Sequence, residues 1–374
     1  MSHRVHGMGL EVASPDWAPL VEDELVAPLT ELGLAADPLR VLWHSPRPMS
    51  AASRVLAGGQ QLIVKRHYEL VRSAARLDLE HRFGDHLRAH GVSTPRCLRG
   101  PDGRSVASVG PYHYEVFELA SGEDLYRDVP SWFPYRKPEH ARRAGAALAR
   151  FHRAAASFGE PASAPDVLLD DVDLVSAADP ERAWTRRLAT RPGLERALAP
   201  YGHRDDLRDV LVEPLAEAFA ATHALTRQWT HGDWHPSNLT WDPSNGQVVS
   251  VFDLGLANRT FALHDVAIAI ERAVVDWLDV GGQGEVRADL ASLDALLAGY
   301  HEVIPLSVED RWALAAILPV AHVEFALSEV EYFGDVLSDA TNRDLAYRGY
   351  LLGHVAFFST PVGRDLLARI RESG

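Results

Sequence analysis

The sequence predicts an α+β fold, in which a small antiparallel sheet is followed by a larger, mostly helical part. Before residue 119, about five short apolar stretches are separated by turn residues, a pattern typical of strands. From residue 120 onward, long stretches carry apolar residues at helical spacing. A chain of 374 residues can form two parts with a substantial core each. We therefore predict two domains, residues 1–119 and 120–374.

The first predicted domain combines one sheet with two helices. Its strands are expected at residues 40–44, 54–57, 61–67, 104–109 and 112–119. Gly58-Gly59 lies between two of these strands and indicates a hairpin. Residues 17–34 and 73–90 have apolar residues at helical spacing, and Gly91 is typical of a residue that ends a helix. This domain is therefore a strand-rich unit built around a central helix.

The second predicted domain is dominated by helices. They are expected at residues 139–158, 194–225, 263–279, 286–302, 308–333 and 340–371. Residues 166–179 are acidic and irregular, which indicates a surface loop. Residues 243–246 are turn residues between two apolar stretches and indicate a hairpin.

Composition excludes several classes of protein. The net charge of −15 argues against a nucleic-acid partner, which requires a basic surface. Cys97 is the single cysteine, so no internal disulfide forms, and this fits a reducing cytoplasm. No apolar run approaches the length that spans a bilayer, and residues 1–16 lack the apolar segment of a secretory signal. We expect a cytoplasmic monomer or homodimer without membrane or nucleic-acid partners.

The most informative motif is His231-Gly232-Asp233, followed by Asn238 and then by Asp253-Leu254-Gly255. Phosphoryl transfer from a nucleoside triphosphate needs a carboxylate that accepts the proton of the attacking hydroxyl, and oxygen ligands that hold Mg²⁺ on the phosphates. The catalytic loop of protein kinases has the same spacing from Asp to Asn, with a later Asp-x-Gly. Turn or capping roles are the ordinary alternative for an isolated Asp or Asn. The ordered set favours phosphoryl transfer.

Residues 229–265, together with Lys65 and Glu80, resemble the aminoglycoside phosphotransferase and choline kinase family, small-molecule relatives of protein kinases. The resemblance covers about residues 40–275. It implies a bilobal, protein-kinase-like fold, with ATP or GTP as donor, Mg²⁺ as cofactor and a small-molecule hydroxyl as acceptor. It also implies that Asp233 is the catalytic base and that Asn238 and Asp253 bind Mg²⁺.

The same resemblance assigns candidate nucleotide contacts in the first domain. Lys65 would meet the α- and β-phosphates, held by an ion pair with Glu80; an edge-strand lysine is the competing interpretation. Residues 45–54 contain no G-x-G-x-x-G, but small residues such as Ser53 allow phosphate to approach. Glu118 and Ala120 lie where backbone groups would meet the base.

Two other positions bear on the catalytic loop. Gly255 stands where many family members carry a second acid, so the choice between one and two metal ions stays open. His231 is expected to orient the loop, and Asp265 to support it through hydrogen bonds rather than to bind metal.

The acceptor is expected to meet acidic and aromatic side chains after Asp253. The acids are Glu271, Asp276, Asp279, Glu324, Glu329 and Glu331, and the aromatic residues are Trp277, Phe325, Tyr332 and Phe333. Such a set suits an amino-bearing or polyhydroxylated ligand. The alternative is that the acids are solvated and the aromatic residues form core.

These observations leave three functions in order of preference. The first is phosphorylation of an antibiotic, which confers resistance. The alternative is a metabolic or biosynthetic kinase that acts on homoserine, choline, a sugar or a cyclitol. A nucleotide-binding pseudokinase ranks last, because Lys65, Asp233, Asn238 and Asp253 are all present.

Overall fold

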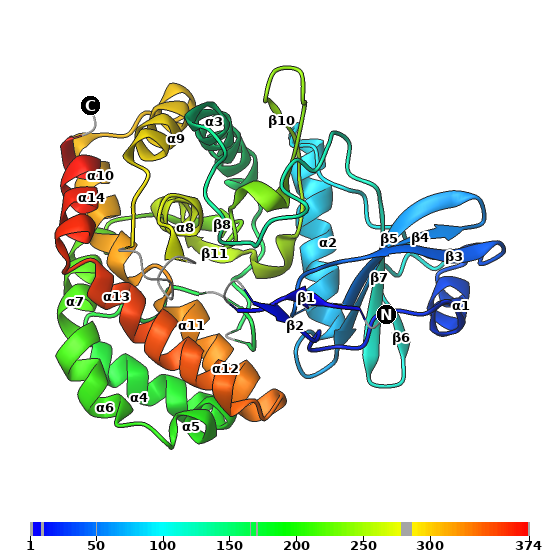
Figure 1. Ribbon diagram of the computed structural model, residues 1–374, viewed down its shortest axis with the longest axis horizontal. Coiled ribbons are helices and arrows are strands. Elements are labelled where there is room, and N and C mark those ends of the chain that lie inside the picture. Colours follow the sequence, from blue (N-terminus) through cyan, green and yellow to red (C-terminus); the bar gives the residue numbers. More distant parts are fainter. Residues whose placement is uncertain are drawn as a thin grey trace. The chain divides into compact units, whose positions relative to one another are not determined.

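The structure is a computed structural model that describes residues 3–8, 11–49, 51–164, 166–169, 171–277 and 286–372. It has the predicted α+β fold, with one strand-rich and one helical part (Figure 1). The chain divides into two compact units. The first unit comprises Met1–Ser131 and Ser237–Gly255, and the second comprises Trp132–Pro236 and Leu256–Gly374.

The first unit is built on a five-stranded antiparallel sheet with the strand order β3-β4-β5-β7-β6. Its strands are β3 (Leu39–His44), β4 (Ala51–Ala57), β5 (Gln60–Tyr68), β6 (Ala107–Val109) and β7 (Tyr112–Glu118). Gly58 and Gly59 both have positive φ, as the tight hairpin between β4 and β5 requires. A short pair, β1 (Val5–His6) and β2 (Val12–Ala13), precedes the sheet.

Two helices cover the two faces of this sheet (Figure 1). Helix α1 (Glu22–Glu31) buries Leu25 and Leu29 against the face that carries Val64 and Val116. Helix α2 (Ala74–Ala89) begins at the Ser73 cap and lies on the opposite face, where His81 contacts Glu115 of β7. Because side chains alternate along a strand, Val64 and Lys65 of β5 face opposite sides of the sheet. Lys65 therefore lies on the α2 side.

A hairpin from the middle of the sequence completes the first unit. It consists of β9 (Leu239–Trp241) and β10 (Val248–Val251). Backbone N–H groups of Glu123 and Trp241 each donate to the other residue's carbonyl at 2.8 Å, and Val251 N–H donates to Ser93 O. These bonds group residues 237–255 with the first unit, whereas the sequence-based division assigned everything after residue 119 to the second domain.

The second unit is mostly helical. Its helices are α3 (Pro138–Ala155), α4 (Pro180–Thr190), α5 (Pro192–Leu198), α6 (His203–Asp206), α7 (Val212–Thr222), α8 (Ala262–Ala273), α9 (Leu290–Val303), α10 (Val308–Ile317), α11 (Val323–Glu331), α12 (Ala340–Leu345), α13 (His354–Phe357) and α14 (Pro361–Glu372). The strands β8 (Arg227–Thr230) and β11 (Asn258–Phe261) form an antiparallel pair. In the sequence, β8 ends just before the predicted catalytic loop, and β11 follows Asp253. The predicted helix at 340–371 is interrupted, because Pro361 starts a new helix after a turn.

One helical stretch corrects an expectation from the sequence. Val308–Val336 spans 29 residues and is apolar enough, by length and composition, to cross a membrane. However, 89% of its apolar window is buried inside the structure. It therefore serves as a central helical segment of the second unit, whose apolar side chains pack against protein.

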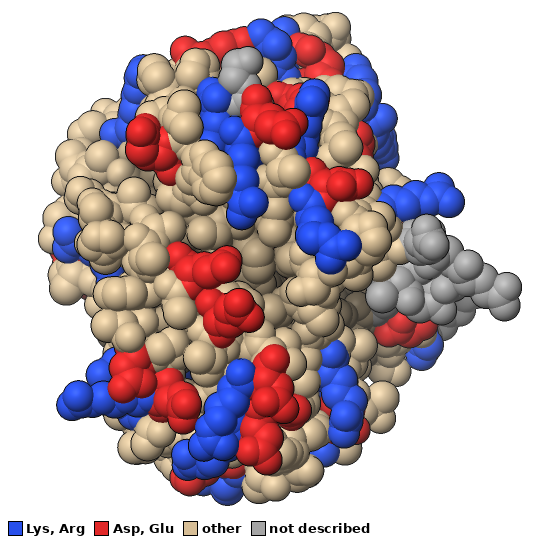
Figure 2. Space-filling view, turned by 90° about the vertical axis from the view of Figure 1, so that its left-hand side faces the viewer, with Lys and Arg blue, Asp and Glu red and all other residues tan. Residues whose placement is uncertain are grey.

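Charged side chains of both signs lie on the face of the molecule drawn in Figure 2. On the face drawn in Figure 2, the coloured acidic and basic side chains are interspersed. Several form ion pairs across elements, such as Arg196 with Asp335 at 2.8 Å and Arg369 with Asp294 at 2.6 Å. Exposed pairs of this kind contribute little stability individually.

Glycines allow the close contact of α3 with α9. A Cβ at Gly145 would lie 2.0 Å from the carbonyl oxygen of Leu296, and one at Gly299 would lie 2.0 Å from that of Arg142. We expect Gly145→Ala to force the helices apart and to destabilise the protein by about 1–3 kcal/mol. Thermal unfolding followed by circular dichroism measures this as a lower Tm.

The matched control for this prediction is Gly159→Ala, because nothing lies within 4 Å of a Cβ at that position. We expect its Tm to stay close to that of the wild type. An unchanged Tm in Gly145→Ala would show that the two helices can separate without cost.

Candidate active site

The predicted catalytic loop begins where β8 ends. Gly232 has a φ of 77°, and a Cβ there would lie 2.4 Å from the carbonyl oxygen of Leu256. Only glycine combines this backbone conformation with so close a contact. The turn at Gly232 sets the direction in which the chain leaves β8, and therefore the position of Asp233.

Asp265 on α8 holds this loop through its carboxylate. Its Oδ2 accepts a hydrogen bond from His231 N–H at 2.8 Å, and its Oδ1 accepts one from Gly232 N–H at 2.9 Å. His152 Nε2 donates to the same carboxylate at 2.9 Å, and the hydroxyl of Tyr300 lies 2.9 Å from the other ring nitrogen of His152. The expected supporting role of Asp265 is confirmed, whereas no sequence pattern pointed to His152 or Tyr300.

Asp233 lies between the guanidinium of Arg272 and the imidazole of His235. Its Oδ1 is 3.3 Å from Nη2 of Arg272, and its Oδ2 is 3.4 Å from Nε2 of His235. Burial raises the pKa of Asp233, but Arg272, His235 and His231 outweigh burial and hold that pKa well below its usual range. Asp233 is therefore a carboxylate that stays ionised and is 20% exposed.

The two predicted metal ligands belong to the first unit. Leu239 pairs with Val251 across the hairpin, and Phe252 N–H donates to Asn238 O at 3.1 Å. Asn238 and Asp253 thus flank the same end of the hairpin. Asp253 has a φ of 61°, an uncommon conformation that turns its carboxylate out of the strand direction. An amide oxygen and a carboxylate suit Mg²⁺, which prefers oxygen ligands and retains several waters.

Lys65 contacts Asp253 directly. Lys65 Nζ lies 2.9 Å from Asp253 Oδ1, and Glu115 is the register partner of Lys65 on β7. Burial lowers the pKa of Lys65, but Asp253 and Glu115 outweigh burial, so this pKa is raised and Lys65 stays charged. The charged lysine of β5 and the carboxylate that follows β10 are therefore in direct contact.

Glu80 has other partners than the predicted Lys65. It accepts hydrogen bonds from Arg72 Nη1 at 3.0 Å and from Arg76 Nε at 2.8 Å. Arg72 also donates to the carbonyl oxygen of Gly255. Arg76 lies one helical turn before Glu80, a spacing that favours ion pairs and could have been noticed in the sequence. Through Arg72, Glu80 of α2 is therefore linked to Gly255, two residues after Asp253.

The remaining predicted nucleotide contacts are placed as follows. Ser53 is the register partner of Val64, so its side chain lies on the sheet face opposite to Lys65, and its hydroxyl is 2.8 Å from His44 Nδ1. The alternation of the strand therefore places this hydroxyl on the face opposite to Lys65, and its phosphate contact stays a prediction. Glu118 ends β7 and pairs with Arg96, and Ala120 follows in the connector.

The predicted acceptor acids separate into two groups. Glu324 and Glu331 share a helix face and pair with Arg187 and Arg191, respectively, so they are structural. Glu271 on α8 and Glu329 on α11 are buried near Arg272. Asp276 lies just beyond α8, and Asp279 lies outside the described residues.

The aromatic residues also differ from one another in role. Tyr332 and Phe333 are fully buried core residues. Phe325 lies 5.3 Å from the Arg272 guanidinium, and Trp277 stacks on His354 at 3.7 Å. Trp132, which the sequence analysis missed, has its ring 3.9 Å from the same guanidinium. Arg272 is thus fixed between Asp233 and an aromatic face.

Burial acts strongly on Glu329. It raises the pKa of Glu329 to about 8, with Glu271 adding to the shift and Arg272 opposing it. His322 is the nearest polar partner, with its Nε2 3.6 Å from Glu329 Oε2. At neutral pH Glu329 is therefore largely protonated, whereas Asp233 beside Arg272 is ionised.

The fold and the site together define a kinase-like phosphotransferase. Lys65 of β5 contacts Asp253, which follows the hairpin strand β10. Asp233 of the catalytic loop, in the helical unit, is kept ionised. Residues 50–306 match the phosphotransferase enzyme family, which groups aminoglycoside phosphotransferases with related kinases, and the chain belongs to this family.

The curated relatives with similar sequences are homoserine kinases. That of Methylobacillus glycogenes is 27% identical over 245 residues, which cover 66% of this chain and 65% of the relative. That of Methylobacillus flagellatus is 27% identical over 271 residues, or 72% and 73% of the two chains. The match thus spans about two thirds of the length of these relatives.

Solved structures support the fold. An aminoglycoside phosphotransferase from Alicyclobacillus acidocaldarius has a TM-score of 0.56 at 19% identity, covering 95% of this chain and 97% of its own. A microcompartment-associated aminopropanol kinase has a TM-score of 0.55 at 19% identity, covering 91% and 97%. At this identity the similarity concerns the fold alone.

Proposed function

We propose that this protein transfers the γ-phosphoryl group of ATP or GTP to a hydroxyl of a small molecule, with homoserine as the first candidate. The observation that carries the proposal is the ionised Asp233, held by Arg272 and His235 in a loop that Asp265 fixes. A carboxylate of this kind can accept the hydroxyl proton as the alcohol attacks phosphorus.

Each proposed role follows from a contact. The new bond joins the acceptor oxygen to the γ-phosphorus, the bond to the β–γ bridging oxygen breaks, and the hydroxyl proton passes to Asp233. The products are a phosphate monoester and a nucleoside diphosphate. Lys65 would bind phosphate oxygens, and Asn238 and Asp253 would hold Mg²⁺. When bound, Mg²⁺ neutralises the charge on the phosphates.

The choice of acceptor rests on the relatives. Both homoserine kinases described above match over most of this chain, whereas the aminoglycoside phosphotransferase structure is similar in fold only. We therefore place a metabolic kinase of the homoserine type before the antibiotic-modifying enzyme that the sequence analysis preferred.

The direct test is a transfer assay with the purified protein, Mg²⁺ and either ATP or GTP. The acceptors are homoserine, an amino alcohol without a carboxylate, choline and an aminoglycoside, and the product is identified by mass spectrometry. We expect a phosphate monoester with the highest kcat/KM for homoserine. Transfer to the aminoglycoside alone would restore the antibiotic hypothesis, and nucleotide binding without transfer to any acceptor would favour a pseudokinase.

The pH dependence of transfer tests the pairing of Arg272 with Asp233. A carboxyl group with a lowered pKa is ionised above that pKa, so in the wild type Asp233 should not limit kcat/KM between pH about 5 and 8. Arg272→Gln removes the largest opposing charge and leaves burial, which raises the pKa. We expect the acid limb of kcat/KM to move to higher pH in this variant.

The matched control is Arg272→Lys, which keeps a positive charge and should keep more of the wild-type profile. Parallel pH profiles in all three proteins would contradict the proposed effect of Arg272 on Asp233.

A further inference from the structure

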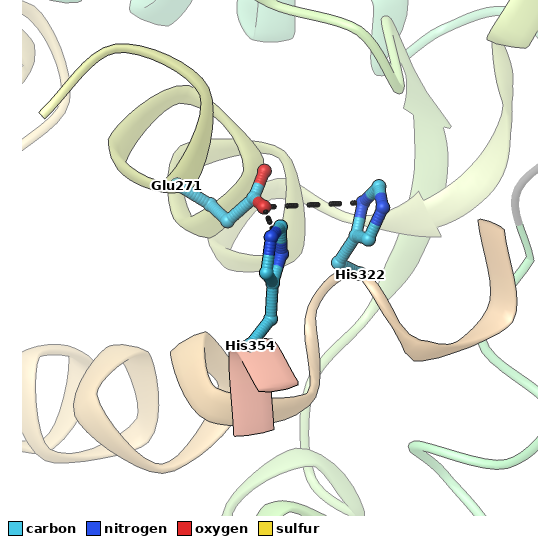
Figure 3. Close-up of side chains that lie close together, drawn as sticks. All are labelled: Glu271, His322 and His354. Atoms are coloured by element: carbon cyan, nitrogen blue, oxygen red, sulfur yellow. Dashed lines mark ion pairs between the residues drawn. The ribbon is translucent and has the colours of Figure 1, made fainter. Parts of the chain in front are cut away.

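Three side chains from separate helical segments of the second unit meet next to Arg272. Glu271 lies on α8, His322 lies just before α11, and His354 begins α13 (Figure 3). Glu271 Oε1 is 2.9 Å from His354 Nδ1 and 4.0 Å from His322 Nδ1. One nitrogen or oxygen of each residue lies within 4.8 Å of the others, and all three residues are buried.

These side chains are short of hydrogen bonds. Apart from the ion-pair contacts among themselves and with Glu329 and Arg272, and among the described residues, both oxygens of Glu271, both ring nitrogens of His322 and Nδ1 of His354 are buried without a hydrogen-bond partner. Leaving buried polar atoms in this state is costly, and native proteins rarely accumulate them in one place. A group that accepts electron pairs from all three residues would remove this cost.

We propose that Glu271, His322 and His354 bind a divalent first-row transition-metal ion, with Zn²⁺ as the best match. Two imidazoles and one carboxylate form a ligand set that zinc sites use, with a fourth position left for water or another ligand. Metal–ligand distances of about 2.0–2.2 Å in tetrahedral geometry put ligand atoms roughly 3.3 Å apart. The 2.9 Å and 4.0 Å separations lie on either side of this value, so a modest approach of His322 completes the site.

The neighbours of His322 favour the tautomer in which Nε2 carries the proton and Nδ1 can bind metal. Its Nε2 is 3.6 Å from Glu329 Oε2, so a proton on Nε2 points toward a carboxyl group and the electron pair of Nδ1 points toward Glu271. Carboxylates commonly fix metal-binding histidines in this way.

The other two ligands are also positioned by neighbours. The ring of His354 stacks on Trp277 with an interplanar angle of 14°. Trp277 Nε1 donates to the carbonyl oxygen of Glu271 at 2.7 Å, which connects the two ligand-bearing segments. Arg272 Nε faces the other oxygen of Glu271 at 3.9 Å and leaves Oε1 directed at the imidazoles.

Charge favours a cation at this position. Asp233 and Glu271 bring two buried or half-buried carboxyl groups, against the single guanidinium of Arg272. A divalent ion would offset the remaining negative charge. Its residues differ from the proposed Mg²⁺ ligands Asn238 and Asp253, which offer only oxygen atoms. The metal proposal does not depend on the proposed kinase function.

Metal content is the primary test. The full chain, prepared without a histidine tag and stripped with a chelator, would be reloaded with Zn²⁺ or Co²⁺ in the presence of excess Mg²⁺. We expect one tightly bound ion per chain by elemental analysis, a visible absorption band for Co²⁺ and a higher Tm with Zn²⁺. Glu271→Gln, His322→Gln and His354→Gln should each lose the ion.

Two further variants sharpen the test. His86 of α2 and His90, just past its end, stack at 4.1 Å and could bind added metal, so the measurements are made in a His86→Asn, His90→Asn background. Glu329→Gln replaces the carboxyl group beside Nε2 of His322 and should weaken binding by about 10–100-fold. Because wild-type stoichiometry and Tm are measured directly, the test holds even where a ligand variant fails to fold.

Two outcomes would overturn the proposal. One is a wild-type chain that binds Zn²⁺ and Co²⁺ no more tightly than a pair of surface histidines would. The other is a Tm that rises with homoserine but not with Zn²⁺, and that no longer responds to homoserine in Glu271→Gln. The second result would assign the cluster to the amine of the acceptor.

Discussion

Asp233→Asn is expected to lower kcat for phosphoryl transfer by about 10²–10⁴-fold, because it removes the group that accepts the hydroxyl proton. The amide is nearly the same size as the carboxylate, so the loop held by Asp265 should keep its conformation. Nucleotide affinity should change little, since the proposed phosphate and metal ligands lie on other segments. Steady-state kinetics and a nucleotide titration measure the two quantities separately.

Asp209→Asn provides the matched control for this prediction. Asp209 is an exposed acid on a helical turn of the second unit, and its replacement makes the same change in charge. We expect wild-type kcat in the control. A wild-type kcat in Asp233→Asn would remove Asp233 as the base, and equal losses in both variants would point to a general effect of charge.

Asp253→Asn is expected to lower turnover by at least about a thousandfold, because metal charge stabilisation is worth several kcal/mol. The substitution replaces an anionic Mg²⁺ ligand with a neutral amide and also removes the charged partner of Lys65, whose Nζ lies 2.9 Å away. Two contacts to the triphosphate therefore weaken together. Initial rates as a function of Mg²⁺ concentration measure the loss, and Mg²⁺-dependent nucleotide affinity should fall in parallel.

The comparison with Lys65→Met separates the two contributions of Asp253. Lys65→Met should weaken phosphate positioning but leave the response to Mg²⁺ concentration close to that of the wild type. Turnover by Asp253→Asn at ordinary Mg²⁺ concentrations would exclude Asp253 as an essential ligand. A Mg²⁺ response altered equally in both variants would mean that the ion pair, rather than the metal ligand, is the essential feature.

The chemistry of the proposed catalytic loop could be predicted from the sequence because it depends on short spacings. Asn238 follows Asp233 by five residues, and Asp253 ends the strand of a hairpin that begins at Leu239. A tight hairpin returns the chain to its starting point, so residues at its two ends must be neighbours. The five strands of the first unit were predictable for the same reason, since glycine-containing turns and alternating side chains are local features.

Partners that come from distant segments were predicted less well. Glu80 was assigned to Lys65 by resemblance, and it does raise the pKa of Lys65, but its hydrogen bonds go to Arg76 on the same helix and to Arg72 just before it. Ser53 was chosen for its small size, yet its position in β4 turns the hydroxyl toward His44. Both differences arise from the register and direction of elements, which residue type alone does not specify.

The sequence by itself determined the family, the two structural parts and the order of the groups proposed for phosphoryl transfer, because spacing along a chain constrains what neighbouring residues can do. Only the tertiary structure decided that Arg272 faces Asp233 and that Glu271, His322 and His354 meet. The three residues of that cluster are separated by 51 and 32 positions in the chain, so no local pattern links them. Their meeting depends on how several helices pack, and packing is set by the burial of side chains across the whole second unit.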